Sequence, residues 1–168
     1  MTSFSLPGSS SLPGSAGIPE FHEVVFEALP TPIFVMDSGL GIIDFNSAAA
    51  ELAESAVLKA FRPSFGEAVH CVEAESASCG NAPGCHACVI RNSVREAVDG
   101  AQVCRKSARL RLRREGAIVE TDHLVTVAPF LDGGETLALL TLDDMNELAA
   151  LIASLNPATL TRFAAATS

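Results

Sequence analysis

The 168-residue sequence contains no tryptophan and no tyrosine, and its only aromatic residues are nine phenylalanines. Hydrophobic residues still make up 48% of the chain, which is enough for an ordinary globular core and excludes a wholly disordered protein. The sequence also lacks any apolar run close to the roughly 20 residues that cross a bilayer, so we expect no membrane span. Its length allows one domain with a full core and additional tails.

Basic residues are scarce, with 11 Lys and Arg against 20 Asp and Glu, and the net charge is −9. This balance disfavours nucleic acid and anionic membranes as partners. The basic stretch 109–114 is a local exception, and its alternation predicts the solvated face of a strand. No Lys or Arg precedes Lys59, and Pro7 and Pro13 interrupt the apolar residues, so we expect no secretion signal and a cytoplasmic location.

Cysteine is also infrequent, but four of the five cysteines lie close together. Cys71, Cys79, Cys85 and Cys88 have the spacing C-x7-C-x5-C-x2-C. Glycine and proline residues break the segment 71–88, which therefore predicts a loop that can fold back on itself. In a reducing compartment clustered cysteines indicate metal or redox chemistry rather than disulfides. Four thiolates on such a loop can surround one metal ion or one iron–sulfur cluster.

Hydrophobic periodicity and turn residues predict the remaining elements. The Ser, Gly and Pro composition of residues 1–18 predicts a disordered tail. Asn46 or Ser47 is a suitable N-cap for the second helix. The expected elements are a helix over 19–29, a hairpin over 32–37 and 42–46, helices over 48–55 and 87–98, strands over 103–113, 118–130 and 136–142, a helix over 143–155, and a further short helix within 158–166.

The stretch L-P-T-P-I-F-V-M-D-S-G-L-G-I-I-D-F-N-S-A-A-A-E-L resembles the opening of a PAS domain. In that family a short helix leads into two strands, an Asp-x-x-Gly type turn separates them, and an Asn starts the next helix. Ser47 departs from the commonest form, which has Pro after the Asn. The expected long helix and three-strand meander continue the PAS order, so the resemblance covers about residues 20–144. It implies an α+β fold with an antiparallel five-stranded sheet, helices on one face and an added C-terminal helix.

This resemblance suggests three regions: the tail 1–18, a PAS-like domain 19–143 that contains the cysteine loop 71–88, and a C-terminal signalling or dimerisation helix within 144–168. The last helix has an apolar stripe at a spacing of three to four residues, formed by Met145, Leu148, Ile152 and Leu155. Such a stripe can pack on its own domain or bind a second helix, and the sequence leaves both possibilities open.

The resemblance also locates the cysteine loop just ahead of the long helix, on the side where PAS family members hold haem, flavin or small ligands. We expect Cys71, Cys79, Cys85 and Cys88 to bind one metal centre, with Cys88 in the first turn of that helix, where the dipole favours a thiolate. Some PAS sensors carry a four-cysteine cluster that is lost in oxygen. We favour an iron–sulfur cluster because zinc has no redox chemistry of its own, and zinc stays the alternative.

Four other residues are possible ligands. His70 and His86 flank the cysteines and could replace one, although such neighbours are more often outside the ligand shell. Cys104 shares a strand face with Leu110 in the expected alternation, which predicts a core thiol. His123 lies in the middle of an expected strand, which predicts a packed histidine more than a haem ligand.

The sequence therefore predicts a sensory or regulatory PAS module that carries an iron–sulfur cluster and signals by contact with a separate output protein such as a kinase or regulator, as a homodimer. One alternative is an interaction module with a structural zinc site. Another is a thiol–disulfide oxidoreductase that uses Cys85 and Cys88, but no strand is expected before this pair, as a thioredoxin-type site requires. With no other catalytic motif present, we expect that the protein is not an enzyme.

Overall fold

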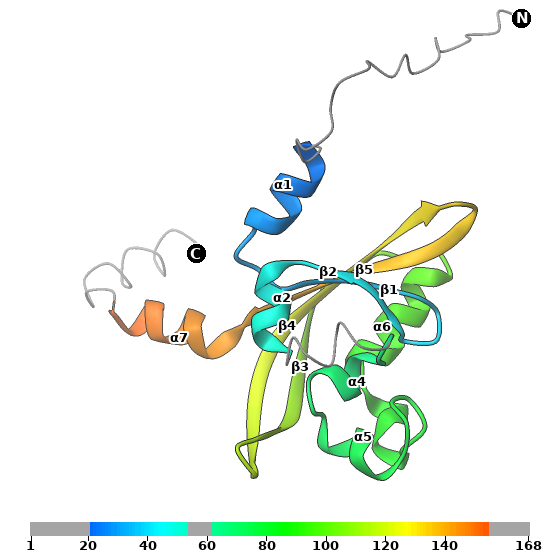
Figure 1. Ribbon diagram of the computed structural model, residues 1–168. Helices are drawn as coiled ribbons and strands as arrows, with labels where there is room; N and C mark the ends of the chain where they lie inside the picture. The colour runs from blue at the N-terminus through cyan, green and yellow to red at the C-terminus, as the bar shows by residue number, and fades with distance from the viewer. Residues whose placement is uncertain (1–20, 54–61, 155–168) are drawn as a thin grey trace, which may run out of the picture.

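The computed structural model describes residues 21–53 and 62–154 (Figure 1). The predicted tail 1–18 and the predicted short helix within 158–166 lie outside these ranges. The helices and strands are α1 (Phe21–Ala28), β1 (Ile33–Met36), β2 (Ile42–Phe45), α2 (Ser47–Leu52), α4 (Phe65–Ala68), α5 (Val72–Ser76), the 3₁₀ helix η1 (Pro83–Ala87), α6 (Val89–Val98), β3 (Val103–Arg114), β4 (Ala117–Asp132), β5 (Glu135–Asp144) and α7 (Met145–Ser154).

The strands form one antiparallel sheet of five strands in the order β2-β1-β5-β4-β3. The predicted hairpin is β1–β2, and the predicted meander is β3–β4–β5. On β3, Ala108, Leu110 and Leu112 are buried while Arg109 and Arg111 are exposed, as the alternation predicts. The α+β fold and the five-stranded sheet expected from the sequence are therefore confirmed.

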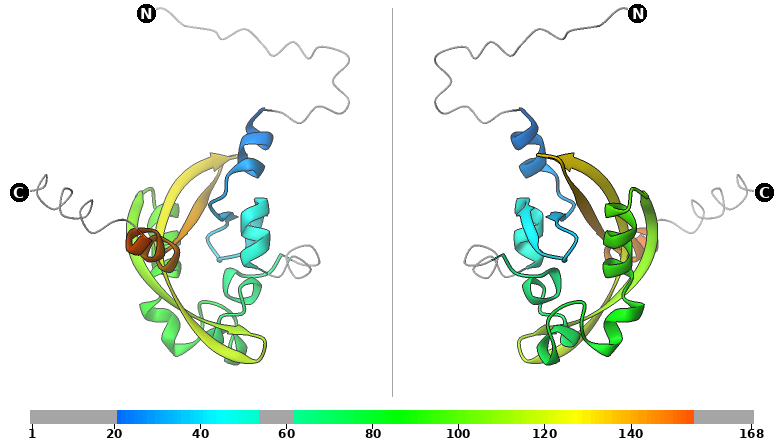
Figure 2. Two further views of the ribbon diagram at one scale, coloured as in Figure 1. Left: turned by 90° about the vertical axis from the view of Figure 1, so that its left-hand side faces the viewer. Right: turned by 90° about the vertical axis from the view of Figure 1, so that its right-hand side faces the viewer.

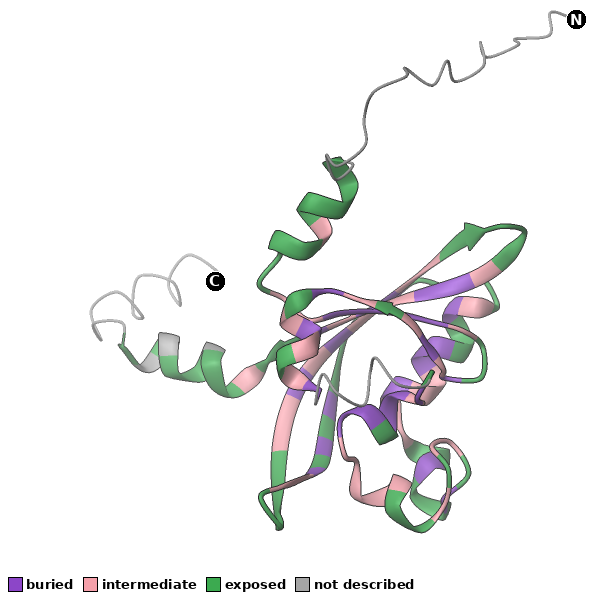
Figure 3. Ribbon diagram, in the orientation of Figure 1, coloured by how far each residue is buried: buried purple, intermediate pink, exposed green. Residues whose placement is uncertain are grey.

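The core lies between the sheet and the helices that cover it. Helix α6 packs across β3, β4 and β5 and buries Ile90, Val94 and Ala97. Figure 2 shows α2 and α4 on the inner side of the curve formed by the three long strands. Buried residues run along the middle of the sheet and along the sides of α4 and α6, whereas the hairpin tips are exposed (Figure 3).

Asn46 joins the start of α2 to the segment between α1 and β1. Its Oδ1 accepts hydrogen bonds from the N–H groups of Ala49 (3.0 Å) and Ile33 (2.9 Å), and its Nδ2 donates to the carbonyl oxygens of Phe26, Leu29 and Thr31. The predicted N-cap is thus confirmed at Asn46. Because the side chain is fully buried, these contacts also replace the water that the five backbone groups would otherwise bind.

Cys104 is exposed, so the prediction of a core thiol is wrong. The pairing of β3 with β4 shifts register between Val103 and Lys106, and Arg105 adopts a left-handed φ of 51°. This bulge breaks the alternation, because an extra residue reverses the side of the sheet on which the following side chains lie. Val103 takes the buried position, and Cys104 faces away from the core.

His123 is buried on β4, as expected for a packed histidine, with only 3% of its surface exposed. Its Nε2 lies 3.0 Å from Thr121 Oγ1, and no hydrogen-bond partner for Nδ1 is present in the described part of the chain. Burial lowers the pKa of His123 from its ordinary value, although Asp144 and Asp122 act in the opposite direction. The folded protein therefore holds His123 neutral more strongly than the unfolded chain does.

This burial predicts a loss of stability in mild acid. Below the unfolded-state pKa of about 6.5 the unfolded chain binds a proton at His123 that the folded chain resists, so the free energy of unfolding falls with pH through that region. Above that pKa, the contribution of His123 to the free energy of unfolding no longer changes with pH. Urea unfolding at pH 7.5, 6.5 and 5.5 should show the fall, and His123→Gln should flatten it. Equal pH dependence of the free energy of unfolding in His123→Gln and in the unaltered chain would contradict the prediction.

The two end helices lie at the periphery of the fold. Helix α1 buries none of its residues, and α7 leaves the end of β5 to contact β4 (Figure 1). The C-terminal helix begins at Met145, two residues later than predicted, because β5 continues through Asp144. Of the predicted apolar stripe, Met145 is half-buried and Ile152 is exposed. Across residues 21–53 and 62–154, no helix is both long and apolar enough to cross a membrane.

Candidate functional site

The four clustered cysteines line one small cavity of about 50 Å³ between the cysteine segment, α6 and β3. Cys85 is buried, and Cys71, Cys79 and Cys88 are half-buried. Apolar residues form much of the remaining wall, including Phe65, Ile90 and Leu110. The four cysteines that are clustered in the sequence therefore line one cavity, and Cys104 is not among the residues that line it.

The cysteine segment contains more regular structure than the predicted loop. Cys71 precedes α5 as its N-cap, Cys85 lies within η1, and Cys88 is the N-cap of α6. The predicted helix from residue 87 therefore begins at Val89, and Cys88 lies immediately before its first turn. Short helices of this kind are too brief for a periodic sequence signal, and their tertiary contacts hold them in place.

Three effects shift the pKa values of two of the thiols, Cys71 and Cys79. Burial raises the pKa of Cys71, and the backbone N–H groups of Glu73 and Ala74 partly counter this rise. Burial also raises the pKa of Cys79, and the N–H of Gly66 counters it. For both thiols, the neighbouring Cys85 and Cys88 raise the pKa further through charge repulsion. Cys71 and Cys79 are therefore each close enough to Cys85 and Cys88 for their charges to interact, and a cation among them would relieve that repulsion.

The donor set fits a soft metal, because four thiolates are the ligands of structural zinc and of iron–sulfur clusters. In the described part of the chain, however, no three Cys, His, Asp or Glu side chains are already grouped closely enough to hold a metal ion. Binding would therefore draw the thiols further into the cavity that they line. Metal binding by these four residues stays a prediction.

Gly66 is packed directly against one of the four sulfurs. A Cβ atom on this residue would lie 2.8 Å from Cys79 Sγ and 3.1 Å from its Cβ, closer than such atoms approach in proteins. Gly66 lies within α4, and its carbonyl oxygen accepts the backbone N–H of Cys71 at 2.7 Å. This glycine therefore brings the backbone of α4 close to two of the cysteines.

Gly66→Ala is expected to destabilise the protein by about 1–3 kcal/mol through overpacking against Cys79. In an open helix the same change stabilises by about 0.5–1 kcal/mol, so the sign of the effect tests the packing. Urea unfolding measures this change in the free energy of unfolding. The double variant Gly66→Ala/Cys79→Ala should recover stability relative to the sum of the two single changes. Additive single effects would contradict the close contact.

Glu73 also lines the cavity, although no sequence motif identifies it as a site residue. Its position two residues after Cys71 is the sequence feature that associates it with the cysteines. Its carboxylate lies against Gly84, where a Cβ would come within 2.6 Å of Oε2, and Arg111 Nη1 lies 3.5 Å from Oε1. By contrast, His86 is exposed, and neither His86 nor His70 is among the residues that line the cavity.

The cysteine segment is attached to the outer edge of β3. Cys71 forms an isolated bridge with Leu112, and the backbone N–H of Arg113 donates to the carbonyl oxygen of His70 at 2.8 Å. The Arg113 guanidinium also pairs with the Glu75 carboxylate, which lowers the pKa of Glu75 through this hydrogen bond. Together with the Arg111–Glu73 pair, these contacts join the candidate site to an edge strand of the sheet.

The Cys85–Cys88 pair does not have the setting of a thioredoxin-type site. Cys85 lies in η1, residues 77–82 before it form turns and bends, and α6 follows Cys88. A thiol–disulfide oxidoreductase site requires a strand directly before the pair. The local structure around Cys85 and Cys88 therefore differs from that of a thioredoxin-type site.

The sequence matches the family model of the PAS domain over residues 20–81. The predicted resemblance to PAS domains is confirmed. The match includes Cys71 and Cys79 and ends before Cys85 and Cys88. The match covers less than half of the chain, and it carries no information on a metal. None of the curated proteins matches the sequence.

Several solved PAS domains are similar to this chain. The PAS domain of nitrogen regulation protein NR(II) from Vibrio parahaemolyticus is 14% identical, with a TM-score of 0.49, over 76% of this chain and 100% of that one. The PAS domain of an HTR-like protein from Haloarcula marismortui is 24% identical (TM-score 0.44; 74% and 94% covered). The PAS domain of BvgS from Bordetella pertussis is 18% identical (TM-score 0.42; 81% and 97% covered).

Proposed function

We propose that this chain is a sensory PAS module in which Cys71, Cys79, Cys85 and Cys88 bind one iron–sulfur cluster, and that it signals through contact with another protein. The observation that carries the proposal is the gathering of these four thiols around one cavity at the edge of the sheet. A cytoplasmic protein and a homodimer are part of the proposal.

The choice of an iron–sulfur cluster follows from the proposed sensory role. A sensor needs a site whose state changes with its surroundings, and an iron–sulfur cluster supplies redox chemistry that zinc lacks. Three of the four thiols are half-buried, so small oxidants can reach them. The backbone N–H groups of Gly66, Glu73 and Ala74 would support negative charge on the sulfurs when the cluster is bound.

A structural zinc site is the second candidate, and the size of the cavity favours it. About 50 Å³ exceeds the roughly 30 Å³ occupied by one water molecule in the liquid, which suits a single ion better than a cluster of several atoms. In that case the protein would be an interaction module whose cysteine segment is fixed by zinc, and air would not change it.

The attachment of the cysteine segment to β3 offers a route from the site to the surface. Release of Cys71 would loosen α5, whose two carboxylates pair with Arg111 and Arg113. Release of Cys88 would loosen the start of α6, which packs across three strands. Either change alters the exposed edge of the sheet, where a partner protein can bind.

Hydrogen exchange tests both the sensory proposal and this route. In protein purified without oxygen, backbone amides of residues 71–88 and of the β3 segment 110–114 should exchange more slowly than in the same protein after exposure to air. The β1 segment should not change. Equal exchange before and after air, with metal still bound, would contradict the sensory role and support structural zinc.

The two ion pairs of this attachment predict a further effect. Arg111→Gln/Arg113→Gln should accelerate amide exchange in residues 71–76, because α5 loses both of its charged contacts with β3. The matched control is Arg109→Gln on the same exposed face, whose partner is Asp122 on the neighbouring strand β4. Equal exchange of residues 71–76 in the double variant and in the control would contradict the proposed attachment.

A further inference from the structure

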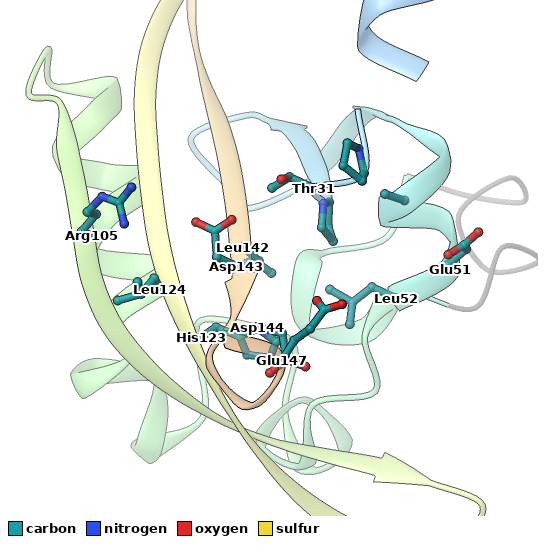
Figure 4. A pocket seen from close by; sticks show the side chains of 13 residues that line it. Thr31, Glu51, Leu52, Arg105, His123, Leu124, Leu142, Asp143, Asp144 and Glu147 are labelled. Carbon is teal, nitrogen blue, oxygen red and sulfur yellow. The ribbon is translucent and has the colours of Figure 1, made fainter. Parts of the chain in front are cut away.

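A second cavity, of about 900 Å³, lies apart from the cysteines, at the end of the sheet where the chain enters β1 and leaves β5 (Figure 4). Its volume is in the range of small-molecule sites. None of the four clustered cysteines lines it. Its walls come from the α1–β1 connection, α2, the three long strands and α7.

The lining of this cavity combines an apolar wall with an excess of negative charge. Leu52, Leu124 and Leu142 belong to the wall, together with two prolines. Four of the lining residues carry a carboxylate (Glu51, Asp143, Asp144 and Glu147), and one, Arg105, carries a guanidinium. This arrangement attracts a cation that carries an apolar body and repels an anion.

His123 adds a polar group that the fold itself leaves incompletely used. It lies opposite Asp144 in the register of β4 and β5, and Figure 4 shows it at the same end of the cavity as Asp144 and Glu147. Burial lowers its pKa, which keeps the ring neutral at pH 7. A neutral ring that donates Nε2–H to Thr121 keeps Nδ1 as an acceptor, and in the described part of the chain Nδ1 has no partner.

We propose that this cavity binds a small organic cation, a primary amine attached to an apolar chain or ring. The ammonium group lies at the end lined by Asp144, Glu147 and His123, and the apolar body lies along the leucines. Because the walls include the connection from α1 and the first turn of α7, a bound amine fixes both end helices relative to the sheet. This site is independent of the proposed metal centre, and the domain would then respond to two signals.

Isothermal titration calorimetry of the full chain with phenethylamine and hexylamine tests the proposal, and phenylacetate and heptanoate serve as anionic counterparts of similar shape. At least one amine should bind, more weakly as salt is raised, and neither carboxylate should bind. Asp144→Asn/Glu147→Gln should weaken binding by about tenfold, since two charges beside the ammonium are lost. Asparagine retains the oxygen that accepts the N–H of Asn146, so the start of α7 is preserved.

The matched control is Asp132→Asn/Glu135→Gln, which removes two charges from the β4–β5 turn, away from the cavity. It should leave amine affinity within about twofold of the unaltered chain, because distant exposed charges are screened by salt. Failure of both amines to bind, equal binding of a carboxylate, or equal weakening by the two double variants would each overturn the proposal. Circular dichroism of each variant confirms that the fold is retained.

Discussion

Replacing Cys85 and Cys88 with serine is expected to remove nearly all bound metal from protein purified without oxygen. Two of the four predicted ligands are lost, and a serine hydroxyl is a poor ligand for the soft metals that thiolates hold. Cys85 is buried in η1, and Cys88 occupies the N-cap position of α6 without a side-chain capping hydrogen bond. Metal-to-protein ratios from elemental analysis measure the loss, and amide exchange in residues 71–88 measures the accompanying release of the segment.

The control for this experiment is Cys104→Ser. Cys104 is exposed on β3, and it is not among the residues that line the cysteine cavity. Its removal should leave the metal content unchanged, so the comparison separates loss of specific ligands from loss of any thiol. Unchanged metal content in Cys85→Ser/Cys88→Ser would show that the metal centre does not depend on these residues and would contradict the assignment.

Asn46→Ala is expected to lower the free energy of unfolding by about 3–5 kcal/mol. The change leaves the buried N–H groups of Ile33 and Ala49 without their acceptor and three carbonyl oxygens without a donor. Each unsatisfied buried group costs about 1–3 kcal/mol, and loss of an N-cap alone costs about 1 kcal/mol. Urea unfolding monitored by circular dichroism measures the effect.

Asn146→Ala is the matched control, because it makes the same substitution at an exposed position, on α7. Such surface changes usually alter stability by less than about 0.5 kcal/mol. Asn46→Asp should recover part of the loss, since it keeps the oxygen that accepts from Ile33 and Ala49 but cannot donate to the three carbonyls. A loss below about 1 kcal/mol for Asn46→Ala would contradict the role of Asn46 in joining α1, β1 and α2.

The parts of the fold that the sequence predicts are those with long or repeated patterns. The meander is predicted because β3 alternates arginines with small and branched apolar residues over several positions, and α6 because its apolar residues recur at helical spacing. The N-cap at Asn46 is predicted by residue type alone. The sequence does not predict the hydrogen bonds from Asn46 Nδ2 to the carbonyl oxygens of Phe26, Leu29 and Thr31, because these groups meet only in the folded chain.

The sequence identifies the four cysteines that line the cavity but not the short helices that position them. Clustering alone identifies Cys71, Cys79, Cys85 and Cys88, whereas α4, α5 and η1 are short and depend on contacts with β3 and with one another. Glu73 joins the site through its packing on Gly84, which no spacing indicates. The error at Cys104 has a different cause, because a single left-handed residue, Arg105, reverses the alternation there.

The visible absorption spectrum of anaerobically purified protein, combined with iron, sulfide and zinc analysis, tests whether the four cysteines hold a redox-sensitive iron–sulfur cluster. We expect broad absorbance near about 400 nm, with stoichiometric iron and sulfide, that bleaches in air and is absent from Cys85→Ser/Cys88→Ser. A colourless protein with one zinc per chain would contradict the iron–sulfur cluster and support the structural zinc site. A colourless protein without metal would contradict both.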